Sequence, residues 1–513
     1  MPSPTISFEL LLGPVADATT DTIRGLNASD VVPRMWAGDY TVWQDDPTEV
    51  ADRLGWMHVI DEMIAAEAEL TSFAAAVVAD GFTEVVLSGM GGSSLFPEVL
   101  QVACGPHDGG IPVSVLDTTD PASVGRVLDR RDQGGVLVVV SSKSGSTIET
   151  RSHMDTMWER RPQAAEFVVV TDPGSELAGL AAERGYRAVF ENRSDIGGRF
   201  SALSYFGLVP AALLGLPWAD WLRDLKSTIA QMGPDADRSE DPALALGSAM
   251  AVAAREGRDK LTVELPDDLA PLGVWIEQLV AESTGKHGTG VVPVIDAAQQ
   301  DPEAYASDRL FVVHDAQRAQ RLADARHPVV LLSVDGGDGL FPLVFLWEMA
   351  TAIAGRVLGL KPFDQPDVAS AKVATNEVLE AGPHEIEPQS VASIIETIRE
   401  GDHLAICAFV DPGAADLVAS LGAVRDRLAA QLGVATTLGF GPRFLHSTGQ
   451  LHKGGPDQIA VLQVASIDGD VPIPGRDYGF ATLEAAQAEG DLEVLRARGR
   501  RAARVHLDEL LAT

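Results

Sequence analysis

The sequence predicts an α/β protein with two doubly wound domains, each a parallel sheet covered by helices on both faces. Three observations support this prediction. At 513 residues the chain is too long for one typical hydrophobic core. Short runs of apolar, β-branched residues alternate with helical patterns, which is typical of parallel sheets. Glycine-rich or serine-rich loops follow two of the expected strands, at the sheet edge where α/β proteins bind ligands.

The first expected domain covers residues 56–235. Before it, residues 1–55 are polar with turn-forming residues, and we expect them to wrap the first domain as short helices. Inside the domain, strand–loop–helix order repeats four times. The strands are expected at Thr83–Leu87, Val113–Leu116, Val136–Val140 and Phe167–Val170.

A second cycle is expected at residues 236–401, after a linker rich in Asp, Pro and Gly at Gly233–Pro242. Its strands are expected at Leu261–Val263, Leu310–Val313 and Val329–Leu332. Residues 402–513 alternate again, and they either complete the second sheet or form a small third unit. The strands of this last segment are expected at Ala405–Val410, Val434–Leu438 and Ile459–Val464.

Composition indicates a soluble globular protein, with 46% apolar and 22% charged residues. The longest apolar stretch, Phe341–Leu360, is interrupted by Glu348 and Arg356, so we expect a buried helix and no membrane partner. The beginning of the chain shows no basic and apolar secretory pattern. Cys104 and Cys407 have no metal-type spacing. We therefore expect a cytoplasmic protein with reduced thiols.

The formal net charge of −35 argues against a nucleic-acid partner, because phosphate backbones are bound through Lys and Arg. The same charge would repel a phosphorylated substrate at long range. Any phosphate site must therefore be built locally, from backbone N–H groups and hydroxyls. Solubility is a sufficient explanation for the acidity, and salt tolerance is an alternative.

The first candidate phosphate loop is Ser88–Ser94, between an expected strand and an expected helix. Glycines allow the backbone to approach an anion, and a helix N-terminus supplies free N–H groups. A dinucleotide fingerprint would need a third glycine where Ser94 stands. A tight strand-to-helix turn without a ligand is the structural alternative.

The second candidate loop is Ser141–Thr147, which also follows a strand and opens a helix. Six hydroxyl or amine side chains in seven positions suit a phosphate, and they can hold a dianion without a large positive field. A serine-rich helix cap is the alternative, although one Ser or Thr would be enough for a cap.

Together, the two loops resemble the phosphate site of sugar-isomerase (SIS-type) domains, and further segments resemble glucose-6-phosphate isomerases. The similarity is greatest to the isomerase half of bifunctional transaldolase/glucose-6-phosphate isomerases, although this chain has no room for a transaldolase barrel of about 250 residues. The segments that carry the resemblance are Gly197–Ser201, Glu282–Lys286, Phe363–Pro366 with Lys372, and Leu445–Gln450.

The resemblance implies SIS-type, flavodoxin-like domains and acid/base chemistry that needs no cofactor and no metal. It implies a hexose phosphate substrate and a homodimer, in which the catalytic histidine of most members comes from the neighbouring subunit. In most members the histidine segment precedes the Phe-Asp-Gln segment, whereas here His446 follows Lys372, as it does in the transaldolase-fused type. Whether His446 acts in its own subunit or a neighbouring one is therefore open.

The resemblance also assigns roles to single residues. Aldose–ketose conversion needs a base for the carbon-bound proton, and an enclosed carboxylate is competent for this step. The resemblance assigns that role to Glu282, stabilisation of the enediolate to Arg199, and ring opening to His446 and Lys372. It implies further substrate contacts by Gly198 and Gln278. The implied phosphate-binding residues are Gly91, Gly92, Ser93, Ser142, Lys143, Ser144 and Thr147.

Each assignment has a structural alternative. Glu282 falls in an expected helix, where a solvated glutamate is common, and Lys372 could be a surface lysine. Arg199 could pair with the nearby Asp195. His446 competes with His287 and His452 for the catalytic role, because a lone histidine is usually buried and satisfied.

The function expected from these residues is the reversible isomerisation of glucose 6-phosphate and fructose 6-phosphate through a cis-enediol. Two alternatives stay open. One is an isomerase for another sugar phosphate, such as mannose 6-phosphate. The other is a sugar-phosphate sensor without catalytic activity, which would keep the phosphate loops but have no use for Glu282 and Arg199.

Overall fold

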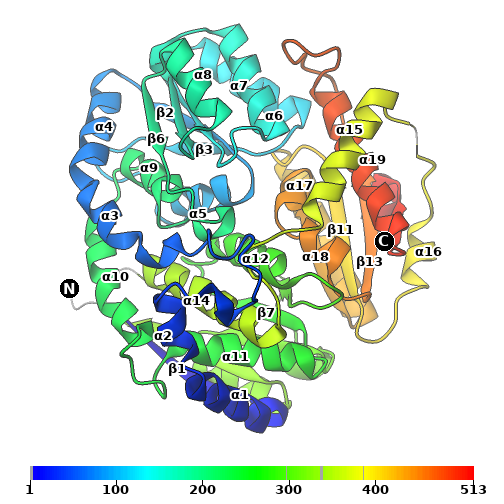
Figure 1. The fold of residues 1–513 in the computed structure, drawn as a ribbon. Helices are drawn as coiled ribbons and strands as arrows, with labels where there is room; N and C mark the ends of the chain where they lie inside the picture. The colour runs from blue at the N-terminus through cyan, green and yellow to red at the C-terminus, as the bar shows by residue number, and fades with distance from the viewer. Residues whose placement is uncertain (1–3, 296, 336–338, 385) are drawn as a thin grey trace.

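Three β-sheets, each flanked by helices, make up the computed structural model, which describes residues 4–295, 297–335, 339–384 and 386–513. In Figure 1 the first sheet lies at the top, the second at the bottom and the third at the right. We call each sheet with its helices the first, second and third unit. The α/β class that the sequence predicts is confirmed, because most neighbouring strands run parallel and alternate with helices along the chain.

The first unit contains a five-stranded parallel sheet. Its elements are α3 (Ile60–Ala65), α4 (Glu67–Ala79), β2 (Glu84–Ser88), η4 (Gly91–Ser93), α5 (Leu95–Ala103), β3 (Val113–Leu116), α6 (Pro121–Asp132), β4 (Val136–Ser141), α7 (Ile148–Arg160), β5 (Phe167–Thr171), α8 (Glu176–Arg184), β6 (Ala188–Glu191), η6 (Gly198–Phe200) and α9 (Tyr205–Leu213). The strand order is β3-β2-β4-β5-β6. Val85 and Leu87 of β2 pack into one apolar cluster and Val86 into another, so both faces of the sheet are buried.

The second unit is built on a mixed sheet. Its elements are α10 (Trp218–Met232), α11 (Pro242–Arg255), β7 (Lys260–Glu264), α12 (Leu272–Thr284), β8 (Val292–Val294), β9 (Arg309–Val313), α13 (Ala316–Asp324), β10 (Val329–Asp335) and α14 (Leu340–Leu358). Strands β10, β9, β7 and β8 lie side by side and parallel. The three strands expected here from the sequence all form, and β8 is an addition.

The N-terminal segment departs from expectation, because it joins the second unit. Its elements are β1 (Thr5–Leu11), α1 (Ala16–Ala28) and α2 (Val31–Trp36). Strand β1 pairs antiparallel with β10 at the edge of the second sheet, and α1 packs on α11. Ile6, Phe8 and Leu10 alternate with polar residues and pack towards the core. This period-two pattern of a strand with one buried face overrides the polar composition that suggested a wrapping segment of helices.

Residues beyond the second sheet form a sheet of their own. The elements of the third unit are α15 (Val368–Ala381), α16 (Val391–Ile395), β11 (His403–Phe409), α17 (Ala415–Leu432), β12 (Ala435–Phe440), η8 (Arg443–His446), α18 (Gly449–Gly454), β13 (Ile459–Ala465), α19 (Phe480–Ala497), β14 (Arg501–Arg504) and α20 (Leu507–Ala512). The parallel order is β12-β11-β13-β14. Helix α15, which the expected boundary at residue 401 places in the second domain, packs along α19 of the third unit.

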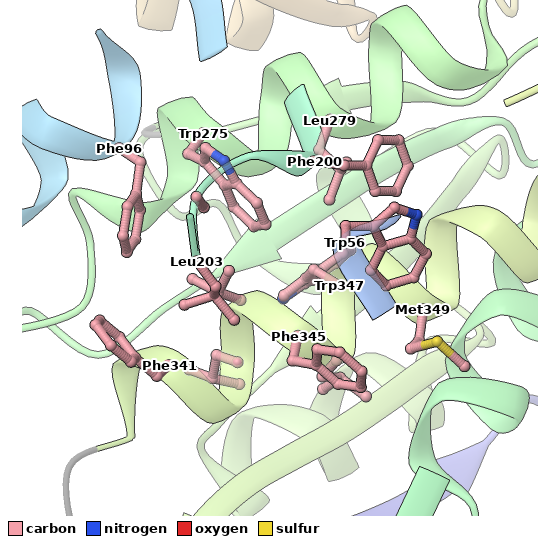
Figure 2. Close-up of a cluster of buried hydrophobic side chains, with 14 of the residues drawn as sticks. Trp56, Phe96, Phe200, Leu203, Trp275, Leu279, Phe341, Phe345, Trp347 and Met349 are labelled. Atoms are coloured by element: carbon pink, nitrogen blue, oxygen red, sulfur yellow. The ribbon is translucent and has the colours of Figure 1, made fainter. Parts of the chain in front are cut away.

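Aromatic side chains join the first and second units in one core (Figure 2). Trp56, which lies just before α3, is 5.1 Å from Phe200 and 5.8 Å from Phe345 between ring centroids. Phe96 of α5 lies 6.2 Å from Trp275 of α12. Rings in this range of separation interact favourably beyond their burial. The shared core fixes α12 of the second unit against the phosphate loops of the first.

Helix α14 runs through the centre of the second unit. It is the one helix among the described residues that is long and apolar enough to cross a membrane, and 94% of its most apolar window is buried inside the structure. Glu348 is buried in its middle. The apolar stretch that stands out in the sequence is therefore a core helix, as expected.

Candidate active site

The first glycine-rich loop leaves the carboxyl end of β2 and forms η4. Gly91 has a φ of +54°, which favours glycine. A Cβ on Gly92 would lie 2.0 Å from the carbonyl oxygen of Gly198, so the missing side chain lets this loop contact η6 directly. Ser94 Oγ donates to the carbonyl of Gly91 at 3.1 Å and closes the turn.

The second loop leaves the carboxyl end of β4 and opens α7. Ser142 Oγ lies 3.3 Å from Thr147 Oγ1 and accepts a hydrogen bond from the N–H of Gly145. Gly145 has a φ of +69°, and this turn presents the hydroxyls of the loop together. Lys143 differs from the other members of the loop, because its ammonium binds the Asp172 carboxylate and, at 2.9 Å, the carbonyl of Ser194. Its charge is largely neutralised within the protein.

Helix α12 places two predicted residues one turn apart on the same face. Gln278 Nε2 donates to Glu282 Oε2 at 3.1 Å and to the carbonyl of His446 at 2.8 Å. On the other side, Glu282 Oε1 lies 3.4 Å from Nη1 of Arg199. The Glu282 side chain is 10% exposed, so the predicted base is an enclosed carboxylate rather than a solvated helix residue.

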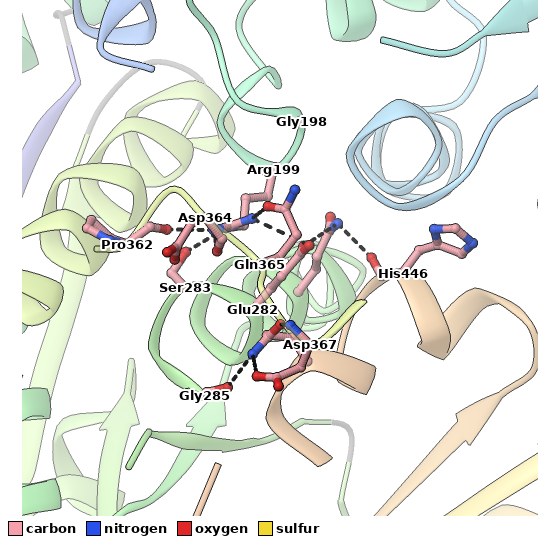
Figure 3. A network of polar contacts seen from close by, with 12 residues as sticks. Gly198, Arg199, Glu282, Ser283, Gly285, Pro362, Asp364, Gln365, Asp367 and His446 are labelled. Carbon is pink, nitrogen blue, oxygen red and sulfur yellow. Dashed lines mark hydrogen bonds and ion pairs between the residues drawn. The ribbon is translucent and has the colours of Figure 1, made fainter. Parts of the chain in front are cut away.

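Arg199 is buried and held by groups from the second unit and the following segment. Nε donates to Ser283 Oγ at 2.8 Å, and Nη1 donates to Gln365 Oε1 at 3.0 Å (Figure 3). Nη2 donates to the carbonyls of Pro362 and Asp364. Burial lowers the pKa of Arg199, and the charges of Glu282 and Asp364 act in the opposite direction. The alternative pairing fails, because Asp195 instead pairs with Arg193 at 2.6 Å.

Lys286, the last residue of the Glu-Ser-Thr-Gly-Lys segment, holds neighbouring backbone and side-chain groups in place. Its buried ammonium donates to the carbonyl of Lys361 at 2.8 Å and to Asp364 Oδ1 at 2.7 Å. Burial lowers the pKa of Lys286 to about 8, the nearby charge of Arg199 acts in the same direction, and Asp364 opposes both. These contacts anchor the segment that presents Gln365 to Arg199. Gln365 lies in the Phe-Asp-Gln-Pro motif but is not among the residues predicted from the sequence.

His446 ends η8 in the third unit and faces the first unit. Its Nε2 lies 2.8 Å from Oε1 of Glu149, in the first turn of α7. Gln487 Nε2 of α19 donates to the same carboxylate oxygen at 2.6 Å. Burial would raise the pKa of Glu149, but the charge and hydrogen bond of His446, together with the charge of Lys372, hold it at about 2. Glu149 is a site residue that was not predicted from the sequence, where its position two residues after Thr147 is the local signal for it.

The two competing histidines lie elsewhere. His452 is buried beside Cys407, with Nδ1 4.0 Å from Sγ, and burial keeps its pKa well below the usual value. His287 lies in a turn with a φ of +57°. Neither lines a cavity with the predicted residues, whereas His446 does.

One cavity of about 330 Å³ brings every predicted site residue together. Its walls come from all three units, because the loops of the first, α12 of the second and η8 of the third meet here. The residues on its wall that the sequence analysis named are Gly91, Gly92, Ser93, Ser142, Lys143, Ser144, Thr147, Gly198, Arg199, Gln278, Glu282, Lys372 and His446. Asp172 and Gln365 are additional polar members.

A second cavity of about 380 Å³ adjoins the first. The two share Thr147, Val368, Lys372 and His446, so these side chains stand between them. Within the described residues, no group of three or more His, Cys, Asp or Glu side chains is placed to hold a metal ion.

Comparisons with known proteins fit this geometry. The family model described as phosphoglucose isomerase matches residues 49–298. A glucose-6-phosphate isomerase from Thermosynechococcus vestitus is 37% identical over 383 residues, which cover 63% of this chain and 72% of that relative. One from Rubrobacter xylanophilus is 29% identical over 416 residues, which cover 69% of this chain and 94% of that relative.

Solved structures support the fold. A hypothetical protein from Thermus thermophilus superposes with a TM-score of 0.62 at 23% identity, covering 72% of this chain and 99% of that one. A glucose-6-phosphate isomerase from Chlamydia trachomatis superposes with a TM-score of 0.52 at 20% identity, covering 69% and 78%. Because this chain covers more than two thirds of a relative to which it is 37% identical, it belongs to the glucose-6-phosphate isomerase family.

Proposed function

We propose that this member of the family interconverts glucose 6-phosphate and fructose 6-phosphate by moving a proton between C2 and C1 through a cis-enediol. One observation carries the proposal. The Glu282 carboxylate lies between Arg199 and Gln278 on the wall of the same cavity that both phosphate loops line. A base, a cation and an anion site thus face one space, as a phosphorylated aldose or ketose requires.

The phosphate would be held by the hydroxyls of the second loop and by backbone N–H groups of both loops. Ser142, Ser144 and Thr147 line the cavity, and Lys143 is already paired with Asp172. A site made mainly of neutral donors can bind a dianion in a protein whose net charge is −35. The affinity would then come from many short hydrogen bonds rather than from a broad positive field.

Transfer of the carbon-bound proton would use Glu282. Its carboxylate takes the proton from C2 of the open-chain aldose and returns it to C1, while a second proton moves between O1 and O2. The electron pair of the broken C–H bond forms the enediolate, whose negative charge Arg199 stabilises. Because hydrogen bonds to Ser283, Gln365 and two carbonyls hold Arg199 rigidly, it acts as a fixed charge that needs little reorganisation.

Ring opening would use His446 and Lys372, which line the cavity from the third unit. The pair of His446 and Glu149 fixes the ring of the histidine, with one nitrogen bound to the carboxylate at 2.8 Å. Gln487 in turn orients Glu149. A carboxylate that fixes an imidazole in this way sets its orientation for proton transfer.

We also propose that the enzyme acts in the cytoplasm and forms the homodimer that the resemblance implies. The contacts of His446 with Glu149 and Gln278 are made within one chain. The described residues therefore support a site that one subunit assembles by itself.

The experiment that tests the proposal is conversion of fructose 6-phosphate to glucose 6-phosphate in EDTA buffer, followed with a coupled dehydrogenase. We expect rapid turnover by the wild type. Glu282→Gln should abolish turnover and leave phosphate binding largely intact, because it removes the base and keeps the shape. Glu159→Gln, on the exposed side of α7, is the matched control and should turn over normally.

The outcomes separate the alternatives. Normal turnover by Glu282→Gln would refute the assigned base. Faster turnover of mannose 6-phosphate than of glucose 6-phosphate would indicate a different sugar range. Tight binding of a hexose phosphate without any turnover would indicate a sensor.

A further inference from the structure

Arg443 begins η8, three residues before His446, and its side chain crosses to the first unit. Its guanidinium binds two carboxylates there. Nε and Nη2 lie 2.7 and 2.8 Å from the two oxygens of Asp117, which is a bidentate pair. Nη1 lies 2.7 Å from Oε2 of Glu98. A planar fork used in this way fixes both distance and orientation, which a lysine cannot do equally well.

The two carboxylates come from the elements that carry the first phosphate loop. Glu98 lies in α5, which η4 leads into, and Asp117 follows β3. Ser94 Oγ bridges Asp117 Oδ2, at 3.3 Å, and the carbonyl of Gly91, at 3.1 Å. A continuous chain of polar contacts thus runs from the His446 turn to the glycine of the phosphate loop.

The phosphate loop and the His446 turn, which lie at the two ends of this series of polar contacts, also touch directly. A Cβ on Gly91 would lie 2.7 Å from the carbonyl oxygen of His446, so the loop and the turn are in van der Waals contact. That carbonyl accepts a hydrogen bond from Gln278, in the second unit. Both the phosphate loop and the helix of the base therefore meet the backbone of His446, and Arg443 joins the same turn to Glu98 and Asp117 of the first unit.

The ion pair of Arg443 and Asp117 is largely shielded from solvent. The Asp117 side chain is 4% exposed and that of Arg443 is 27% exposed. Burial alone would lower the pKa of Arg443, but Asp117 and Glu98 raise it. Removing the guanidinium would leave a buried carboxylate without its cation, and the turn would have to shift or admit water.

We propose that Arg443 is a positioning residue for ring opening, which holds His446 at a fixed distance from the phosphate loop. The proposal rests on the proposed function, because it presumes that His446 acts on the ring oxygen of a bound hexose phosphate. Arg443 itself lines neither cavity. Its effect reaches the substrate only through the position of His446.

Another ion pair between the same two units provides a matched control. Arg126 of α6 binds both carboxylate oxygens of Asp411, which follows β11, at 2.6 and 2.7 Å. It joins the first unit to the third with the same chemistry, yet neither residue lines the cavities. Replacing Arg126 tests what a lost bridge between the units does by itself.

The decisive experiment isolates ring opening from proton transfer. In a Glu282→Gln background, the exchange between the α and β anomers of glucose 6-phosphate is measured by NMR. The exchange catalysed by Glu282→Gln is the reference rate for the substitutions added to it. Adding Arg443→Gln should slow the enzyme-catalysed exchange by roughly tenfold to a hundredfold, the range expected for a catalytic group displaced by about 1 Å. Adding Arg443→Lys should restore part of the loss.

Adding Arg126→Gln to the same background should leave the rate of anomer exchange within about twofold of that of Glu282→Gln. This corresponds to a change of less than about 0.5 kcal/mol in the activation free energy. Circular dichroism and thermal unfolding establish that each variant is folded. The proposal is overturned if folded Arg443→Gln exchanges anomers at the parental rate, or if Arg126→Gln loses as much. Isomerisation by Glu282→Gln alone would instead refute the assigned base, and a wild type that does not turn over fructose 6-phosphate would overturn the proposed function. In both cases the role of Arg443 is judged from the anomer exchange.

Discussion

Gly92 shows how one missing side chain lets two loops form a site. The position of its absent Cβ is 2.0 Å from the Gly198 carbonyl oxygen and 2.8 Å from the Arg199 backbone nitrogen. Both atoms belong to the backbone, so no flexible side chain can move aside. The glycine is thus required by the approach of η6 to the phosphate loop, in addition to any anion that the loop binds.

We predict that Gly92→Ala separates the phosphate loop from the Arg199 loop. Catalytic efficiency with fructose 6-phosphate should fall about a hundredfold, because Arg199 and the phosphate site no longer share one geometry. The free energy of unfolding should fall by roughly 1 to 3 kcal/mol, the usual range for an overpacked site. Steady-state kinetics and urea unfolding measure the two effects.

The control for this variant is Gly25→Ala in α1, where nothing lies within 4 Å of the new methyl group. It should leave the kinetics unchanged and stabilise the helix by roughly 0.5 to 1 kcal/mol. Unchanged kinetics in Gly92→Ala would contradict the prediction and show that the loops can separate without loss.

Single residues of the site could be predicted where a motif surrounds them. Glu282 and Arg199 lie in short segments that resemble a family, and the structure brings them to one cavity. Glu149 could not be found in this way. Its partners, His446 and Gln487, are 297 and 338 residues away in the chain, and no local spacing shows that a helix-start glutamate will be buried between them.

At the scale of elements, α19 is a helix covered on most sides, and its sequence pattern does not show which of its faces are buried. Its buried acidic residues would ordinarily be assigned to a solvated face. Asp491 binds Lys453 and Glu489 binds His384, so these two have partners. Both oxygens of Glu484 lack a hydrogen-bond partner in the described part of the chain.

We predict that Glu484 makes stability depend on pH. Burial, followed by the charges of Asp120 and Asp411, raises its pKa from 4.5 to about 9. The folded state therefore binds one more proton than the unfolded state between these values, so stability falls as pH rises through this window. Glu484→Gln should remove this loss, which amounts to up to roughly 5 kcal/mol at pH 8, and should change little at pH 4.

Urea unfolding of wild type and Glu484→Gln at pH 4, 6 and 8 measures the effect. Glu493→Gln, on the exposed face of the same helix, is the control and should follow the wild type at every pH. A constant difference between Glu484→Gln and the wild type across this range would show that the buried carboxyl does not titrate on unfolding.

Strands were predictable where they are short, apolar and parallel. β2, β4, β7, β9 and β11 all begin within two residues of the expected position, because burial on both faces gives a continuous apolar run. β1 was missed, since an edge strand alternates and its polar half resembles a loop. Whether residues 402–513 form a sheet of their own was undecided, because which strands pair depends on contacts far apart in the chain.

On the scale of the whole molecule, the site lies where three units meet. The phosphate loops come from the first, Glu282 from the second and His446 from the third, and α15 brings Lys372. Two bridges, Arg443 with Asp117 and Arg126 with Asp411, join the third unit to the first within one chain. Residues of all three units of a single chain line this cavity.

We predict that each chain carries a complete site, and mixing two inactive variants tests this directly. Glu282→Gln and His446→Ala are unfolded together, refolded as an equal mixture and assayed with fructose 6-phosphate. If each site used Glu282 and His446 from different subunits, half of the dimers would be mixed, each would have one intact site, and activity would return to roughly a quarter of the wild-type level. Because the contacts of His446 with Glu149 and Gln278 are made within one chain, we expect no recovery. Wild type refolded in the same way controls for yield, and its specific activity should not change on dilution below the concentration at which dimers dissociate.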